Sequence, residues 1–308
     1  MSCCCMEPVL VAGWLVATHM GKPIHLLGTA LSCRSNTTPN TPGGQPHYSS
    51  LAITTALTRG MIFHLALRRT KGLIGSVIGR LGLDLAMPDH STLSRRARTL
   101  DVPPHWRGGT GPLHLLVDST GLKLGGAGEW LIEKHGASRR RSWRKLHIGV
   151  DADTGEIVAV AVTRKEIDDV AMVDALLDPI ADPITSFTAD GAYDQDQVSQ
   201  AVAKRHPEAA VIVPPRAGAV ASASAETAPT QRDRDLRMIA ERGRMVWQKA
   251  SGYNLRAKVG ASIGRYKRVI GDALRSRTDR TEAIEVALAA AALNQMLGLG
   301  RPNCVRIA

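Results

Sequence analysis

Short apolar runs of strand length, mixed with segments of helical periodicity, fill the middle of this 308-residue chain. The strand-length runs are LHLLVD (113–118), KLHIGVDADTGEIVAVAV (145–162), SFTAD (186–190) and AVIVPP (210–215). The second run has two β-rich halves around Asp153, Thr154 and Gly155, which predicts a hairpin. Helical patterns cover residues 167–180, 195–205, 231–249, 254–268 and 281–297. Strands that come first and then alternate with helices predict an α/β fold.

The part of the chain before these strands is predicted to be a small helical module behind a linker. Residues 32–50 are rich in Ser, Thr, Asn, Pro and Gly, which is typical of a linker. Helical spacing follows over 51–85, and Asp89 or Ser91 can cap a further, arginine-rich helix. Two short helices of which the second is basic fit a helix-turn-helix DNA reader. An ordinary helical bundle explains the same pattern equally well.

The charge balance points to a polyanionic partner. Lys and Arg total 39 against 28 Asp and Glu, which gives a net charge of +11 and a pI near 9.8. Such a balance favours nucleic acid as a partner. The five cysteines, at 3, 4, 5, 33 and 304, form no zinc-finger spacing and fit a reducing compartment. We therefore expect a cytoplasmic protein. Residues 8–31 are fairly apolar, but Lys22 and two histidines interrupt them and no basic residue precedes them, so we expect neither a signal peptide nor a membrane span.

Two aspartates follow apolar strand-length runs. Asp118 ends LHLLVD and Asp190 ends SFTAD. Carboxylates at the ends of neighbouring strands can point into one crevice and bind hard divalent cations. Two such cations can stabilise both the attacking and the leaving oxygen of a phosphodiester displacement. An aspartate after a strand is also a common cap or turn residue, and spacing alone does not separate these two interpretations.

A dense basic segment, HGASRRRSWRKLH (135–147), lies between the first strand and the hairpin. Its basic residues are Arg139, Arg140, Arg141, Arg144 and Lys145, with Trp143 among them. Beside the two carboxylates, this segment would offset their repulsion with DNA phosphates, and the indole could stack on a base. The alternative is a solvated basic turn with the indole in the core.

Several long motifs in a fixed order resemble the bacterial insertion-sequence transposases of the DDE type. They are PLHLLVDSTGLKLGGAGEW, KHGASRRRSWRKLHIGVDADTGEI, TADGAYD, VPPR and SGYNLRAKVGASIGRYKRVIGDALRSR. The resemblance covers about residues 42–303. It implies a ribonuclease-H-like mixed sheet flanked by helices, with two aspartates and a glutamate that bind divalent metal. Asp118 and Asp190 match the first two of these carboxylates.

The third motif of such enzymes reads Tyr, two residues, Arg, three residues, Glu, six residues, Lys. Tyr253, Arg256 and Lys267 fall in register, but Gly260 stands where the family has Glu. On one helix these four positions would share a face, so the Tyr, Arg and Lys are expected to contact DNA. A basic amphipathic helix packed on the sheet has the same periodicity. We read Gly260 as the catalytic position that has lost its carboxylate.

The resemblance implies metal-dependent hydrolysis of phosphodiester bonds at the terminal repeats of the protein's own element, followed by strand transfer. Mg²⁺ (or Mn²⁺) is the expected cofactor, and double-stranded DNA, both element ends and target, the expected partner. Synapsis implies a dimer or larger assembly, with no membrane involved. A degenerate copy that binds DNA without cutting it is the rival hypothesis, and a metal-dependent nuclease is a third. The predicted division is a poorly ordered leader (1–41), a helical module (42–104) that is a candidate DNA-binding unit, and a catalytic domain (105–303).

Overall fold

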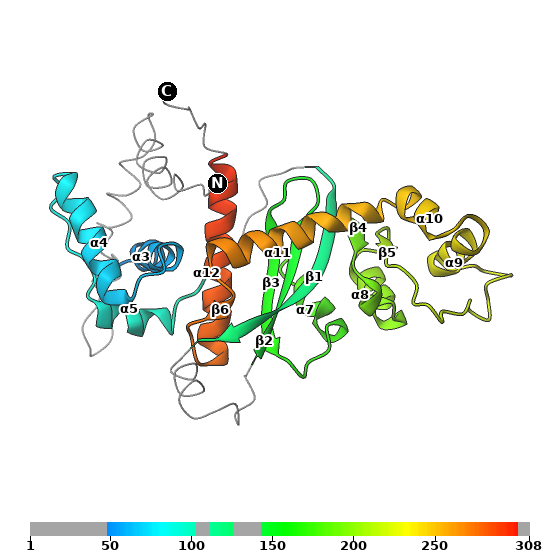
Figure 1. Ribbon diagram of the computed structural model, residues 1–308, viewed down its shortest axis with the longest axis horizontal. Helices are drawn as coiled ribbons and strands as arrows, with labels where there is room; N and C mark the ends of the chain where they lie inside the picture. The colour runs from blue at the N-terminus through cyan, green and yellow to red at the C-terminus, as the bar shows by residue number, and fades with distance from the viewer. Residues whose placement is uncertain (1–47, 103–110, 126–142, 301–308) are drawn as a thin grey trace, which may run out of the picture. The chain divides into compact units, whose positions relative to one another are not determined.

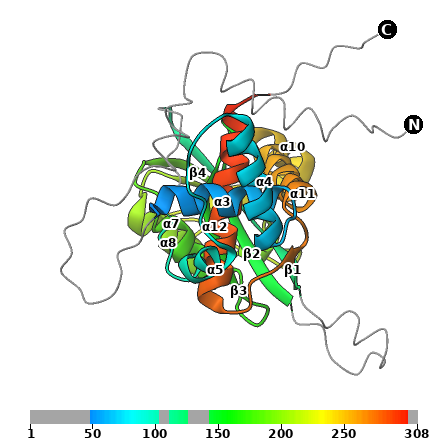
Figure 2. The same ribbon diagram turned by 90° about the vertical axis from the view of Figure 1, so that its left-hand side faces the viewer.

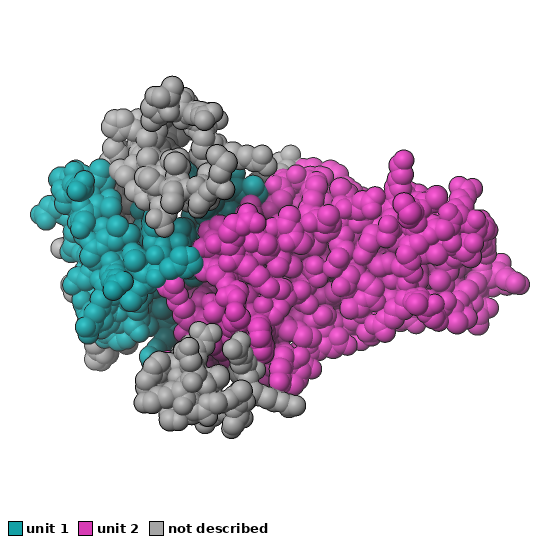
Figure 3. Space-filling model, in the orientation of Figure 1, with its two compact units in different colours: residues 1–102, 292–308 teal, residues 103–291 magenta. Residues whose placement is uncertain are grey.

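The computed structural model describes residues 48–102, 111–125 and 143–300. The chain divides into two compact units, one of residues 1–102 and 292–308 and the other of residues 103–291 (Figure 3). The predicted leader and the arginines at 139, 140 and 141 lie outside the described residues.

Three helices make up the described N-terminal part of the first unit: α3 (Ser50–Ile62), α4 (Leu67–Arg80) and α5 (His90–Ala97) (Figure 2). The Asp89 side chain caps α5 through the backbone N–H of Ser91, as predicted. A Cβ at Gly60 would lie only 2.5 Å from Thr70 Oγ1, so the absence of a side chain there lets α3 and α4 approach closely. The three helices contact one another, and each buries an apolar side chain: Ile53, Ile74 and Leu93.

No single helix among the described residues is long and apolar enough to cross a membrane. By length and composition alone, α3 and α4 pass the same test as a pair, with a bend of 109° between them. Buried core helices also pass such a test, so this pair gives little support for a membrane segment.

A mixed six-stranded sheet forms the centre of the second unit. Its strands are β1 (Leu113–Leu124), β2 (Trp143–Asp151), β3 (Ile157–Arg164), β4 (Ile184–Thr188), β5 (Ala210–Ile212) and β6 (Ala273–Leu274). The order is β3-β2-β1-β4-β5, with β6 paired to the far end of β1. The first three strands are antiparallel, and β4 runs parallel to β1 and to β5. This confirms the ribonuclease-H-like mixed sheet that the resemblance implies.

The predicted hairpin is the antiparallel pair of β2 and β3. Buried Asp151 closes the turn, because its carboxylate accepts hydrogen bonds from the Asp153 N–H at 3.1 Å and the Thr154 hydroxyl at 2.8 Å. Gly155 has φ +74°, a left-handed conformation that favours glycine. The motif DADTG therefore specifies the turn locally.

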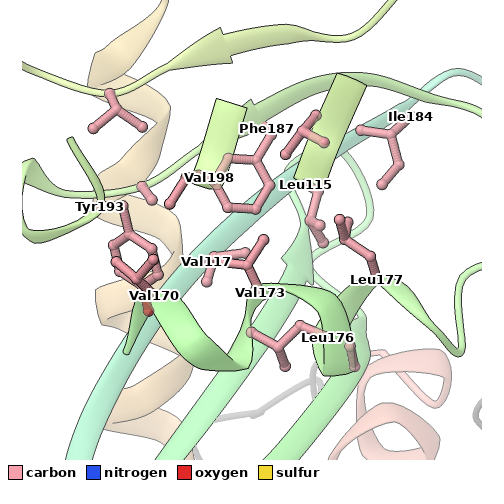
Figure 4. Close-up of a cluster of buried hydrophobic side chains, with 14 of the residues drawn as sticks. Leu115, Val117, Val170, Val173, Leu176, Leu177, Ile184, Phe187, Tyr193 and Val198 are labelled. Carbon is pink, nitrogen blue, oxygen red and sulfur yellow. The ribbon is translucent and has the colours of Figure 1, made fainter. Parts of the chain in front are cut away.

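Helices flank the sheet (Figure 1). They are η1 (Val170–Met172), α7 (Val173–Leu177), η2 (Gly191–Tyr193), α8 (Asp196–Arg205), α9 (Gln231–Arg242), α10 (Arg244–Ala250), η3 (Tyr253–Arg256), α11 (Ala257–Val269) and α12 (Asp279–Gly298). Side chains alternate between the faces of β1, so Leu115 and Val117 join the main core with Val173, Phe187 and Val198 (Figure 4). The other face of β1 lies against α11, which crosses the strands (Figure 1).

Three sequence predictions about element length are wrong. The helix predicted over 231–249 is broken at Gly243, where φ is +86°. The pattern at 167–180 yields only η1 and the short helix α7, and the helix predicted from residue 254 begins as the 3₁₀ turn η3. Short strand β6 was not foreseen, because two residues carry no detectable alternation.

Candidate active site

Asp118 lies in the middle of β1 and not at its end. The strand continues to Leu124, because β2 pairs with it as far as Lys123. The carboxylate is 17% exposed and accepts a hydrogen bond from the Ser119 N–H at 2.9 Å. It belongs to the face of β1 that lies opposite the core residues Leu115 and Val117. Asp118 is thus fixed on a central strand and reachable from the α11 side.

Asp190 follows β4, the parallel neighbour of β1. It caps the 3₁₀ turn η2, since its carboxylate accepts a hydrogen bond from the Ala192 N–H at 2.9 Å. Asp190 is therefore a cap residue, which is one of the two interpretations that the sequence allowed. The same carboxylate also lies near Asp118, since both contact Arg256. Parallel pairing of β1 with β4 brings the two carboxylates to the same region, although Asp118 lies inside its strand and not at the strand end that the sequence predicted.

Arg256 joins the two aspartates. One terminal nitrogen of its guanidinium lies 3.0 Å from Asp118 Oδ2 and 3.4 Å from Asp190 Oδ2. Burial raises the pKa of the Asp118 carboxyl, and the charge of Asp190 acts in the same direction, against the opposing effects of Arg256 and the Ser119 N–H. The two aspartates therefore form an anionic pair that is held together by a cation.

Lys267 and Tyr253 stand on either side of Arg256 in sequence. Lys267 Nζ lies 2.7 Å from Thr120 Oγ1, two residues beyond Asp118 on the same face of β1. The Tyr253 ring packs on Trp247 with centroids 5.5 Å apart, and burial raises the pKa of its hydroxyl. The motif thus places its Arg and its Lys along β1.

Gly260 is exposed on α11, one turn after Arg256. A Cβ built there meets no atom within 4 Å, so the backbone has room for a longer side chain. In the ranges that the structure describes, no three or more His, Cys, Asp or Glu side chains are grouped to hold a metal ion. Within those ranges the carboxylate set is thus limited to Asp118 and Asp190.

The described part of the basic segment is engaged in ion pairs within the protein. Arg144 is 15% exposed and donates to Glu282 at 2.6 Å and to Asp279 at 3.0 Å. Lys145 contacts the Ile167 carbonyl at 2.8 Å and Asp169 at 3.2 Å. It alternates with Arg144 along β2 and so faces the opposite side of the sheet from Asp118. The structure therefore does not bring Arg144 and Lys145 to the carboxylate pair.

Trp143 is 37% exposed beside Gly121, where a Cβ would lie 3.3 Å from the indole. The core alternative for this ring is therefore wrong. Two glutamates of α12, Glu282 and Glu285, are held by contacts within the protein. Glu282 is buried against Arg144, and the Glu285 carboxylate accepts hydrogen bonds from the Arg275 and Ser276 N–H groups.

Sequence reasoning missed the polar network around the turn that follows Asp190. Asp194 is buried and pairs with Arg232, and Arg216 donates to two carbonyls of the same turn. The sequence offered two weak signals for these residues: Asp194 lies four residues after Asp190, and Arg216 ends the VPPR motif. No local pattern links Asp194 to a residue on α9.

Two family models, each described as a transposase DDE domain, match residues 26–127 and 109–295. Among solved structures, similarity is found to the Drosophila P element transposase strand transfer complex, at 10% identity and a TM-score of 0.31, covering 96% of this chain and 67% of that one. The Mos1 transposase paired-end complex with left transposon end matches at 10% identity and a TM-score of 0.23, covering 94% and 96%. Those structural overlaps are low, and the sheet order and the family match carry the fold assignment.

Proposed function

Because the chain belongs to the family of transposases with a DDE domain, we propose that it hydrolyses phosphodiester bonds at the terminal repeats of its own mobile element and joins the freed 3′ hydroxyls to target DNA. The observation that carries this proposal is the convergence of Asp118 and Asp190 on one nitrogen of Arg256. Clustered carboxylates of this kind can hold the metal ions of a two-metal phosphodiester displacement.

The residues present fit a hard divalent cation. Asp118 and Asp190 offer carboxylate oxygens on adjacent elements, and a cationic group already lies between them. These two side chains would hold Mg²⁺ or Mn²⁺, both of which prefer oxygen ligands. Such an ion, when bound, would acidify a water nucleophile and neutralise charge on the scissile phosphate. The fit is partial, since the third ligand of the family is replaced by Gly260.

Basic side chains beside the carboxylates supply the phosphate contacts in this proposal. Arg256 has five N–H donors, and the two aspartates engage one of its terminal nitrogens. Lys267 lies further along β1 at Thr120. Their charges offset the repulsion between the aspartates and a DNA phosphate, and Tyr253 is assigned to contact the same strand. Arg139, Arg140 and Arg141 are assigned to the flanking duplex.

The helical unit is proposed to bind the element ends. The chain turns by 109° between α3 and α4, within the range of helix-turn-helix units. The exposed side chains of α4 include Arg68, Arg69, Lys71 and Arg80. Cutting and joining require two DNA ends to be held together, so we infer at least a dimer during the reaction.

A cleavage assay tests the proposed function. The unmodified chain is incubated with Mg²⁺ or Mn²⁺ and a duplex that carries one end of its element, and 3′-hydroxyl products are separated on a denaturing gel. Cleavage is expected at the element end, and none with Asp118→Asn or Asp190→Asn. Cleavage by all three proteins at the same measurable rate would sink the assignment of these carboxylates.

A second function, binding of element ends without cleavage, is favoured by one observation. Gly260 removes the third carboxylate, and no other acidic group completes the site in the described parts of the chain. In this case the unmodified chain retains end-specific binding in a gel-shift assay but gives no product in the cleavage assay. It would then inhibit an intact relative by occupying its ends.

A further inference from the structure

The turn that carries Asp190 is held by the chain segment that follows β5. The Arg216 guanidinium donates to the Gly191 carbonyl at 3.1 Å and to the Ala192 carbonyl at 2.9 Å. The backbone N–H of Arg216 donates to Asp194 Oδ2 at 2.9 Å. One arginine thus contacts both the start of turn η2 and its C-cap.

A second arginine fixes the end of the same turn. Arg232 on α9 makes a two-pronged contact with Asp194, with Nε at 2.7 Å from Oδ1 and a terminal nitrogen at 3.2 Å from Oδ2. The Asp194 side chain is only 4% exposed, whereas the Arg232 side chain is 32% exposed, so the carboxylate is the shielded partner of the pair. A fork of this kind holds a carboxylate in direction as well as in position. Arg232 also donates to the Val220 carbonyl at 3.0 Å, which ties the loop to the same pair.

Backbone packing completes the support. A Cβ at Gly191 would lie 3.3 Å from the Pro214 carbonyl oxygen, so the turn rests closely on the VPPR segment. Arg244, at the start of α10, donates to the Pro215 carbonyl at 2.9 Å. The segment between β5 and α10 therefore supports turn η2 through polar contacts. The supporting residues are Pro214–Arg216, Arg232 and Arg244.

We propose that Arg216 and Arg232 are positioning residues for Asp190: they hold turn η2 so that the carboxylate that caps it faces Asp118. This inference rests on the proposed function, in which that carboxylate binds a divalent cation. A ligand must be held within about half an ångström to be effective, and a 3₁₀ turn of three residues has few hydrogen bonds of its own to do so. Neither arginine touches the reacting atoms in this proposal.

The test compares full-length Arg216→Ala, Arg232→Ala and Arg232→Lys with the unmodified chain. Arg237→Ala is the matched control, because Arg237 is exposed on the same helix α9 and donates to the Ala225 carbonyl at 3.5 Å, outside turn η2. Hydrogen exchange of the segment 188–196 reports on the turn, and a Mn²⁺ titration followed by electron paramagnetic resonance reports on the site. Circular dichroism establishes that each variant is folded.

Arg216→Ala and Arg232→Ala are expected to speed exchange in segment 188–196 and to weaken Mn²⁺ binding roughly tenfold, the size of effect found for outer groups that orient a metal ligand. Arg232→Lys should recover part of both losses, because it keeps the charge but not the fork. Arg237→Ala should change neither. If Arg232→Ala does not fold, Asp194→Asn removes the same pair with little change in size and gives the same two readouts.

Folded Arg216→Ala and Arg232→Ala proteins with unchanged exchange and unchanged Mn²⁺ affinity would overturn the positioning role. Failure of the proposed function looks different: the unmodified chain and Asp118→Asn would then bind Mn²⁺ with the same affinity. In that event the exchange of segment 188–196 alone decides whether the two arginines hold the turn.

Discussion

At the scale of single residues, position 260 has the largest predicted effect. Gly260→Glu would add a carboxylate one turn after Arg256, at a site where the backbone has open space. We expect Mg²⁺-dependent cleavage of element-end DNA to rise by roughly a hundredfold, since one group that stabilises charge in the transition state commonly has this effect. Cleavage rates of the two proteins on the same duplex measure it.

The variant Gly260→Gln distinguishes the effect of an added carboxylate on cleavage from the effect of removing a glycine on helix stability. Removing the glycine should stabilise α11 by about 1 kcal/mol in either variant, because glycine disfavours a helix interior. Only the Glu variant should gain cleavage, and both should gain thermal stability. Equal cleavage by the unmodified chain and Gly260→Glu would mean that another residue completes the site and that α11 does not carry the third ligand.

Asp194 makes a pH-dependent contribution to stability. Burial acts to raise the pKa of its carboxyl, but hydrogen bonds from Arg232 and the Arg216 N–H outweigh burial and lower the pKa below its usual value. The folded-state pKa therefore lies below the unfolded value of about 4, so the contribution is present above that pH and is lost as the pH falls through the folded-state pKa.

Asp194→Asn should consequently be less stable than the unmodified chain near neutral pH, by roughly 2 kcal/mol, as is typical for hydrogen bonds to charged groups. The difference should shrink as the pH falls below about 4 and through the folded-state pKa, where the carboxylate of the unmodified chain becomes protonated. Urea unfolding of both proteins across this range is the measurement. A difference that does not vary with pH would show that Asp194 acts through packing and not through charge.

At the scale of elements, the sequence predicts turns and caps that are determined by residues close to one another in the chain. The β2–β3 hairpin follows from DADTG, and the cap of α5 follows from Asp89, because both depend on contacts within a few residues. The break between α9 and α10 was missed, although Gly243 marks it. A single glycine is tolerated in many helices, so its presence alone did not predict a left-handed residue.

Long-range ion pairs could not be predicted in this way. The pairing of Arg144 on β2 with Glu282 on α12 depends on how two distant segments pack, and the sequence gives no register for it. Local density of positive charge led to Arg144 being predicted as a DNA contact. The structure places its guanidinium in a pair with a carboxylate that is 1% exposed.

Glu282→Ala is expected to destabilise the protein by about 3 kcal/mol, because it leaves the largely buried Arg144 without its principal partner. The double variant Arg144→Met with Glu282→Leu should recover much of the loss, since apolar residues of similar volume often replace a buried pair at little cost. Urea unfolding measures both. Equal destabilisation by the single and double variants would show that packing of α12, and not the unpaired charge, sets the cost.

At the scale of the whole molecule, the topology of the sheet brings together the two aspartates that the sequence only suggested as a pair. Asp118 and Asp190 lie far apart in sequence, and parallel pairing of β1 with β4 brings them to the same arginine. The family motif predicted which residues belong together, but it did not predict that Arg256 would bridge the two carboxylates. That contact depends on where η3 meets the sheet, which no spacing in the sequence specifies.

The net charge of +11 predicts DNA binding that weakens steeply with salt. Each phosphate contact should add about −0.9 to the slope of log affinity against log salt concentration, because counterions are released from the duplex. Arg140→Gln with Arg141→Gln should weaken binding and flatten this slope by up to about 2. Fluorescence anisotropy with a labelled duplex over a range of salt concentrations gives both quantities.

Lys145→Gln supplies the internal comparison, because Lys145 is paired with Asp169 on the face of the sheet opposite Asp118. We expect it to leave the slope nearly unchanged, although it belongs to the same run of basic residues. The run of basic residues would then contain both residues that stabilise the fold and residues that contact phosphate. An equal reduction of the slope by Lys145→Gln and by either arginine substitution would contradict this division and make the whole segment a single DNA-binding surface.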